Sequence, residues 1–191
     1  MVYASLEQCP VIGGTVKSFD AGKAKTMPGV IDVVQIPDGV AVVADTYWHA
    51  KKAREALSVQ WDEGAGATLN DKAMLDGMRA GAPGDKMLPL TPVGDADAVI
   101  KGATKVVKAE YTMPLLSHSP LEPMNFTAHF HDNKVDLIGP TQWQDAAAGT
   151  VAKVVGVPPE NVTLRTTFLG GGFGRRIDID FIIQAAQISK G

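Results

Sequence analysis

Cysteine is almost missing from this chain, which has Cys9 and no other in 191 residues. One cysteine cannot form an internal disulfide, so the fold is not held by cystines and the redox compartment cannot be inferred from them. Cys9 stands beside Pro10 near the start of the chain. No surrounding motif indicates a nucleophile, and we expect Cys9 to have a structural role.

Long apolar runs and a large charge of either sign are also missing. No segment approaches the roughly 20 consecutive apolar residues that span a bilayer, and the first residues lack the basic and apolar regions of a signal peptide. The net charge is −3, which gives no indication of a surface for nucleic acid or acidic membranes. These properties leave open whether the protein is periplasmic or cytoplasmic.

What is present is ordinary for a globular protein. Hydrophobic residues make up 45% and charged residues 20% of the chain, which is enough apolar material for a hydrophobic core. The length suits one large or two small domains. Both ends of the chain fall at the boundaries of expected elements, so we interpret the sequence as a piece of a longer polypeptide.

The first 63 residues predict a compact α+β unit. Thr46 is a suitable N-cap for a helix over 47–57, and Pro37-Asp38-Gly39 predicts a turn between two strands. The predicted strands are 15–20, 30–36, 40–44 and 58–61, and a short helix is predicted over 21–27. The expected core of this unit includes its aromatic side chains, Tyr47, Trp48 and Trp61.

Residues 64–103 differ in character, since glycine and proline interrupt them throughout. We expect short helices over 70–80 and 95–101 within a linker. Residues 104–191 predict a second α+β unit. Its strands are expected over 104–113, 125–131, 135–138 and 161–168, and its helices over 142–155 and 177–189, the second of them largely buried. The expected inward side chains of the first helix are Ala146, Val151, Val154 and Val155.

The most informative motif is the run from Leu169 to Arg176, Leu-Gly-Gly-Gly-Phe-Gly-Arg-Arg, between an expected strand and an expected helix. Its glycines let the main chain approach a ligand without Cβ atoms in the way, and its arginines supply charge and several donors. This arrangement is a common site for an anion or an oxygen-rich cofactor. The run lacks the Walker A pattern and fits the dinucleotide-binding pattern poorly. A tight turn that packs a helix on a strand is the alternative.

Two further segments carry polar groups in loops. Residues 116–125 form either a cavity wall or a rigid crossover in which Glu122 caps a backbone group. His118 and Glu122 have no third ligand at a useful spacing, so no metal site is predicted there. In the segment 139–144, the amide of Gln142 can donate and accept hydrogen bonds toward a ligand. The remaining histidines, His49, His129 and His131, are expected to be ordinary surface or strand residues.

Taken in order, Ser-His-Ser-Pro-Leu-Glu-Pro-Met-Asn at 117–125, Pro-Thr-Gln at 140–142 and the glycine run resemble the molybdenum hydroxylases, the xanthine dehydrogenase and aldehyde oxidase family. Cys-Pro-Val-Ile-Gly-Gly at 9–14 and the ending Phe-Gly-Arg-Arg are similar to the branch with the isoquinoline 1-oxidoreductase beta subunit and membrane-linked aldehyde dehydrogenases. The resemblance implies a small α/β hammerhead domain, a linker and the first part of a mixed α/β molybdopterin-binding domain, at 1–63, 64–103 and 104–191.

The resemblance also implies a cofactor site. Gln142 would donate toward an oxo ligand of molybdenum, the main chain of the glycine run would approach the same centre, and the Phe173 ring would pack beneath it. Arg175 or Arg176 would pair with a cofactor phosphate. The implied cofactor is molybdopterin with molybdenum, in its cytosine dinucleotide form, and an isolated chain would retain none. The implied binding residues are Gln142, Gly171, Gly172, Phe173, Gly174 and Arg175.

The resemblance is incomplete in two places. Arg176 and Ile177 stand where xanthine-type members carry a lysine and a substrate-facing glutamate, so recognition of a purine is not implied. The catalytic glutamate of the family lies farther along a longer chain. The catalytic residue is therefore unknown, and Glu122 is not assigned that role.

The implied function is that of a fragment, inactive alone, of the catalytic subunit of an oxidoreductase that hydroxylates an aldehyde or N-heterocycle with water as the oxygen source. Its partners would be the rest of that subunit and an iron–sulfur subunit, since one cysteine cannot hold such clusters. Its second half would expose apolar surface and promote self-association. A non-catalytic binding or assembly module with an anion-holding glycine loop is the alternative. A nucleotide-dependent enzyme is a third, disfavoured by the missing phosphate-binding patterns.

Overall fold

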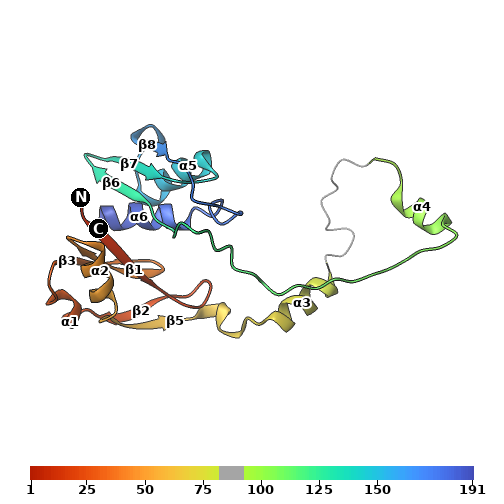
Figure 1. Cartoon of the computed structure of the whole chain (residues 1–191), viewed down its shortest axis with the longest axis horizontal. Coiled ribbons are helices and arrows are strands. Elements are labelled where there is room, and N and C mark those ends of the chain that lie inside the picture. Colours follow the sequence, from red (N-terminus) through yellow and green to blue (C-terminus); the bar gives the residue numbers. More distant parts are fainter. Residues whose placement is uncertain (82–92) are drawn as a thin grey trace. The chain divides into compact units, whose positions relative to one another are not determined.

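A computed structural model describes residues 1–81 and 93–191, which fall into two compact units (Figure 1). One unit joins residues from both halves of the sequence, Met1–Ala67 and Ser117–Gly191. The other consists of the described residues of Thr68–Leu116. Residues 82–92, a part of the expected linker, lie outside the described residues. The fold is α+β, as the sequence predicted.

The N-terminal sheet has three antiparallel strands in the order β1 (Tyr3–Gln8), β4 (Gly39–Ala44), β3 (Val30–Ile36). Every residue of the central strand β4 is buried, because a strand lies on each side and the helix α2 (Tyr47–Arg54) packs against the sheet. Thr46 caps this helix, since its Oγ1 accepts a hydrogen bond of 3.2 Å from the His49 N–H. The predicted strands and cap are confirmed. The fully buried side chains of this core are Ala24, Val42 and Ala53.

Smaller elements complete this N-terminal region. The helix α1 (Gly22–Lys25) precedes β3, and β2 (Thr15–Asp20) pairs with β5 (Ser58–Asp62) as a separate antiparallel pair. The sequence pattern did not predict β1. That strand has no β-branched residue, so pairing with β4 rather than its own propensity makes it a strand.

The second sheet combines an antiparallel hairpin with a parallel strand, in the order β6 (Thr127–His131), β7 (Lys134–Gly139), β8 (Val162–Thr166). The hairpin turn is Asp132-Asn133, with φ of 46° and 59°, as in a two-residue turn that matches strand twist. The crossover from β7 to β8 contains α5 (Gln144–Val155) and the short 3₁₀ helix η3 (Pro159–Asn161). Gly156 ends α5 in the left-handed conformation, as predicted.

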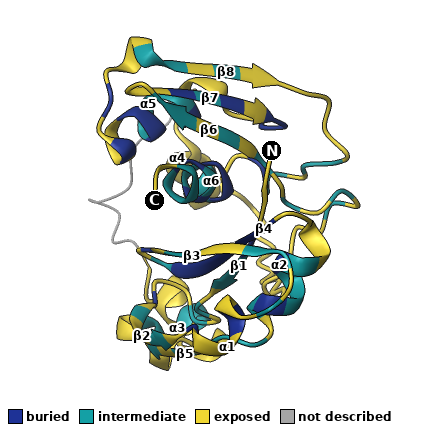
Figure 2. Cartoon of the chain, turned by 90° about the vertical axis from the view of Figure 1, so that its left-hand side faces the viewer, coloured by how far each residue is buried: buried dark blue, intermediate teal, exposed yellow. Residues whose placement is uncertain are grey.

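The helix α6 (Asp180–Lys190) lies between the two three-stranded sheets of this unit, as Figure 2 shows. One side packs against β6 and α5, and the other contacts β3. Gln184 Nε2 on this helix donates a 2.7 Å hydrogen bond to Asp38 Oδ2 in the turn before β4. The predicted burial of this helix is confirmed. Side chains from β7, α5 and α6 form the main core, namely Val135, Leu137, Ala147, Val151, Ala152, Val155, Val157, Phe181, Ile182 and Ala186.

Several sequence predictions about packing are wrong. Residues 104–113 form no strand, because no described segment pairs with them and β propensity alone does not make a strand. Tyr47 and Trp48 are 56% and 60% exposed, since they start α2 on its outer face. In α5, Val154 is 41% exposed while Ala147 and Ala152 are buried, so the buried stripe is rotated from the predicted one.

The unit of residues 68–116 contains two helices among its described residues. These are α3 (Asp71–Ala80), capped by Asn70, and α4 (Ala96–Gly102), capped by Asp95. The 3₁₀ helix η1 (Gly64–Thr68) precedes them. In the described parts of the chain, no helix has the length and apolar character needed to cross a membrane.

Candidate functional site

The glycine run and Gln142 meet at one edge of the second sheet. Gly139, the last residue of β7, pairs with Thr166, the last residue of the parallel strand β8. Gln142 lies just beyond β7, and residues 169–176 lie just beyond β8. The carboxyl ends of parallel strands are where ligands bind in open α/β sheets.

Hydrogen bonds tie the three predicted segments together at this edge. The Gln142 N–H and the Thr141 Oγ1 both donate to the Arg176 carbonyl, at 3.0 and 3.3 Å. The Glu122 N–H donates to the Gly170 carbonyl at 3.2 Å. Segments far apart in the sequence therefore share one hydrogen-bonded loop cluster, which we call the loop edge: residues 117–125, 139–144 and 167–179.

Side chains pack directly on the glycines of the loop edge. A Cβ on Gly172 would overlap the Gln142 side-chain amide, and a Cβ on Gly170 would overlap Glu122. A Cβ on Gly174 would lie 3.6 Å from the His118 ring. Glycine at 170 and 172 is thus required by close approach of a neighbouring side chain rather than by an unusual φ.

The main chain of the glycine run forms a cradle of N–H groups. Gly171, Phe173 and Gly174 have φ of 102°, 52° and 88°, which is the left-handed region. Within the described residues, the N–H groups of 171–174 donate to no other group. Successive N–H groups in alternating conformations create an anion-binding concavity. The Phe173 side chain is 74% exposed, and its ring lies beside Gly171.

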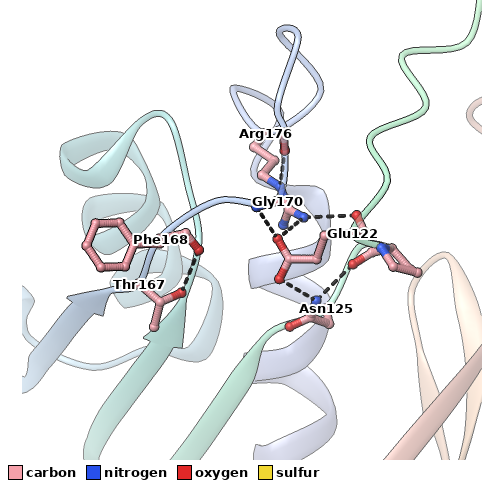
Figure 3. A network of polar contacts seen from close by, with 8 residues as sticks. Glu122, Asn125, Thr167, Phe168, Gly170 and Arg176 are labelled. Atoms are coloured by element: carbon pink, nitrogen blue, oxygen red, sulfur yellow. Dashed lines mark hydrogen bonds and ion pairs between the residues drawn. The ribbon is translucent and has the colours of Figure 1, made fainter.

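An ion pair between Arg176 and Glu122 fixes the base of the cradle (Figure 3). The Arg176 side chain is fully buried. Its Nη2 donates to Glu122 Oε2 at 2.8 Å and to the Glu122 carbonyl at 3.1 Å, and its Nε donates to the Gly171 carbonyl at 3.0 Å. Within the described residues, its Nη1 is buried without a partner. Arg176 therefore holds the loop from inside, and the prediction that Arg175 or Arg176 pairs with a cofactor phosphate stays a prediction.

Glu122 serves as a structural carboxylate. Its Oε2 also accepts a 2.8 Å hydrogen bond from the Gly170 N–H, and its Oε1 accepts from the Asn125 amide at 3.3 Å. These hydrogen bonds, the Gly170 one foremost, and the charge of Arg176 hold the pKa of Glu122 below its usual value. Glu122 thus caps a backbone N–H group, as the crossover interpretation of residues 116–125 expected.

Arg175 is paired but partly exposed. Its Nη1 and Nη2 donate to Asp180 Oδ1 and Oδ2 at 2.9 and 2.8 Å, and 27% of its side chain is exposed. Asp180 raises the pKa of Arg175. Sequence reasoning missed both partners of these arginines. Asp180 is only five residues after Arg175, so their pairing could be inferred from the local sequence. Glu122 is 54 residues from Arg176, and the local sequence does not indicate their pairing.

Comparisons with known proteins agree with this geometry. Residues 81–189 match the molybdopterin cofactor-binding domain family. Over its whole length the chain is 33% identical to the membrane-bound aldehyde dehydrogenase [pyrroloquinoline-quinone] of Gluconacetobacter polyoxogenes and 28% identical to the isoquinoline 1-oxidoreductase subunit beta of Brevundimonas diminuta. It spans 26% of the length of each.

A solved structure shows the same fold at low sequence identity. The crystal structure of quinoline 2-oxidoreductase from Pseudomonas putida 86 matches 98% of this chain with a TM-score of 0.67 and 17% identity, over 30% of its own chain. The family match covers more than half of the sequence and includes the loop edge. The chain therefore belongs to the molybdopterin-binding subunits of the xanthine dehydrogenase and aldehyde oxidoreductase family, as a portion corresponding to about a quarter of its curated relatives.

Proposed function

We propose that this chain forms one wall of the molybdopterin site in the catalytic subunit of a molybdenum hydroxylase. The enzyme would hydroxylate an aldehyde or an N-heterocycle with water as the oxygen source. The observation that carries the proposal is the cradle of unpaired N–H groups at 171–174, with the Gln142 amide packed against it.

The residues of the loop edge fit a group rich in oxygen atoms. The N–H groups of 171–174 and the Gln142 amide are neutral donors, which bind oxo and phosphate oxygens at close range. The partly exposed Arg175 supplies the positive charge that a phosphate would need. The cofactor, when bound, supplies the oxidation–reduction chemistry. The chain supplies position, since Gln142 and the main-chain donors are held by the Arg176–Glu122 pair below them.

Several finer assignments rest on the same proposal. Residues 1–63 would be the hammerhead domain, 64–103 a linker, and 104–191 the first part of the molybdopterin-binding domain. The pterin would be the cytosine dinucleotide form. The chain spans 26% of its relatives' length, so the rest of the catalytic subunit would complete the site. An iron–sulfur subunit would carry electrons away, because Cys9 alone cannot ligate a cluster.

The described residues of this chain contain no group that we assign as the catalytic base. Glu122 is a carboxylate beside the cradle, yet both of its oxygens are engaged by Gly170, Asn125 and Arg176. A base needs a carboxylate that can take up a proton near neutral pH. The lowered pKa of Glu122 is the opposite property.

The direct test measures molybdenum by elemental mass spectrometry, and pterin by fluorescence after oxidation, on the protein purified from its native source. About one molybdenum per chain supports the proposal. In the same preparation, Gln142→Ala should lower the molybdenum content, while Gln144→Ala, an exposed glutamine at the start of α5, should not.

Absence of molybdenum from a folded protein would contradict the proposal. It would favour the alternative, a binding or assembly module whose loop holds an anion. A bound quinone in place of a pterin, which the name of the Gluconacetobacter relative specifies for that protein, would also contradict the proposal.

A further inference from the structure

The outer face of the β6–β7 hairpin carries a cluster of metal-ligating side chains. Along β6, Ala128 and Phe130 pack on the core, so His129 and His131 lie on the opposite face. In β7, Asp136 lies between the buried Val135 and Leu137 and shares that outer face. The antiparallel register places Asp136 directly opposite His129. Strand alternation and hairpin pairing thus bring three ligand-type side chains together.

The ligand atoms of the three side chains lie close together. His131 Nε2 lies 3.0 Å from Asp136 Oδ2, and the rings of His129 and His131 are stacked with centroids 4.4 Å apart. One potential ligand atom from each residue lies within 4.8 Å of the other two. This is the only such group in the parts of the chain that the structure describes.

We propose that His129, His131 and Asp136 bind one divalent transition-metal ion, with Zn²⁺ as the expected occupant. Imidazole nitrogen and carboxylate oxygen are its common protein ligands, and water would fill the remaining position. Ligand atoms around a tetrahedral Zn²⁺ lie about 3.4 Å apart, given bonds of about 2.0–2.1 Å. Rotation of these partly exposed side chains closes the difference from the observed spacing.

Neighbouring groups support this assignment. Asp132 Oδ2 lies 3.5 Å from His131 Nδ1, so it can hold the ring nitrogen that faces away from a metal at Nε2. A carboxylate in that position orients a metal-binding imidazole. Lys134 is a cation on the same outer face, opposite His131 in the register and exposed. Its flexible chain can turn into solvent when a metal ion is present.

This site is separate from the loop edge and does not depend on the proposed function. Asp136 is near the hairpin-turn end of β7, whereas Gln142 follows the opposite end of that strand and the glycine run follows the adjacent end of β8. Sequence reasoning predicted no metal ligand and ordinary roles for both histidines. The spacing of His129 and His131 alone does not reveal Asp136, which the hairpin register brings to them.

The test is isothermal titration of the untagged 191-residue chain with Zn²⁺ alone. We expect one saturable site. His129→Ala, His131→Ala and Asp136→Asn should each weaken binding by about tenfold or more. The matched control is His49→Ala, which removes another surface histidine that is paired with a single carboxylate, Asp45, at 2.6 Å. This control should leave the affinity unchanged, and circular dichroism checks that every variant is folded.

Paramagnetic resonance of the Cu²⁺-loaded chain gives a second measurement, and its main result comes from the wild-type chain. Two imidazole nitrogens should couple to the metal in the wild-type chain, and one in His129→Ala. Absence of saturable Zn²⁺ binding would overturn the proposal. Binding that survives His129→Ala and His131→Ala unchanged, or a Cu²⁺ spectrum without two imidazoles, would also overturn it.

Discussion

At the level of single residues, Arg176 is the largest fully buried side chain of the described chain. Arg176→Met keeps much of its volume but removes the charged donor of the Glu122 carboxylate and the Nε donor of the Gly171 carbonyl. We expect a loss of about 2–4 kcal/mol of unfolding free energy, less than for a fully buried pair because Glu122 is partly exposed. Urea unfolding measures this loss. Arg165→Met, an exposed arginine of β8, is the control and should change stability by less than about 0.5 kcal/mol.

The ionisation of Glu122 predicts a pH dependence. The Gly170 N–H, the Asn125 amide and Arg176 lower the pKa of Glu122 in the folded state from its ordinary 4.5. Its contribution is therefore present in full above the unfolded-state pKa and is lost as pH falls through the lower folded-state value. Thermal unfolding from pH 7 to pH 3 should show a smaller loss of Tm for Glu122→Gln than for wild type. An identical loss in both would contradict this assignment.

At Gly172 a substitution would cause a steric clash without backbone strain, so the two effects can be told apart. Gly172→Ala introduces a Cβ that meets the Gln142 amide, whereas its φ is not in the left-handed region. In the full-length subunit we expect Gly172→Ala to displace Gln142 and lower molybdenum content. Gly149→Ala in α5, where an added Cβ meets nothing within 4 Å, should retain molybdenum and stabilise the helix by about 0.5–1 kcal/mol. Equal molybdenum contents in the two variants would argue against a role for Gln142.

The sequence predicted the functional motif but not the side-chain partners of its arginines. The motif at 169–176 indicated a loop for an oxygen-rich ligand, and the structure brings that loop to Gln142. The two arginines looked equivalent in sequence, but one is buried and the other is partly exposed. Their partners depend on tertiary packing, which a local pattern does not encode.

At the level of elements, local signals predicted the structure well wherever a cap or turn marked a boundary. Thr46, Asn70 and Asp95 accept capping hydrogen bonds, and Asp132-Asn133 forms the hairpin turn. The prediction of a strand over residues 104–113 is wrong because a strand forms only where another strand pairs with it. The opposite error was made for β1, which was not predicted as a strand. Its pairing with β4 outweighs its weak strand propensity.

The hairpin turn allows a test of this reasoning. Asn133 has φ of 59°, a conformation that glycine adopts freely and alanine does not. We expect Asn133→Gly to preserve stability or to raise it slightly, and Asn133→Ala to lower it by about 1 kcal/mol. Both variants keep the main-chain carbonyl that accepts from Asn161. Thermal unfolding of the two variants measures this difference. An alanine variant more stable than the glycine variant would show that the turn is not of this type.

At the scale of the whole molecule, the described residues leave large apolar side chains in solvent around the loop edge. The exposed set is Phe168, Leu121, Phe173, Trp143, Ile177 and Leu169, with exposures from 41% to 100%. Exposed large apolar side chains that gather in one loop cluster indicate an interaction site. This agrees with the sequence prediction that the second half of the chain exposes apolar surface.

We therefore expect the isolated chain to self-associate. Sedimentation velocity should show a mass that rises with protein concentration, and Phe168→Asp should reduce the effect because Phe168 is fully exposed. Lys134→Asp, a charge change on the exposed face of the hairpin, is the control and should leave self-association unchanged. A monomer at all concentrations would contradict the prediction.

The position of α6 between the two sheets has a consequence for synthesis on the ribosome. Asp38 and its partner Gln184 are 146 residues apart in the chain, a distance that translation at about 5–20 residues per second covers in about 7–30 s. During that interval the nascent N-terminal sheet has no α6 to cover it. Chaperones that shield apolar segments of nascent chains are thus expected to bind this protein early and to leave once α6 emerges.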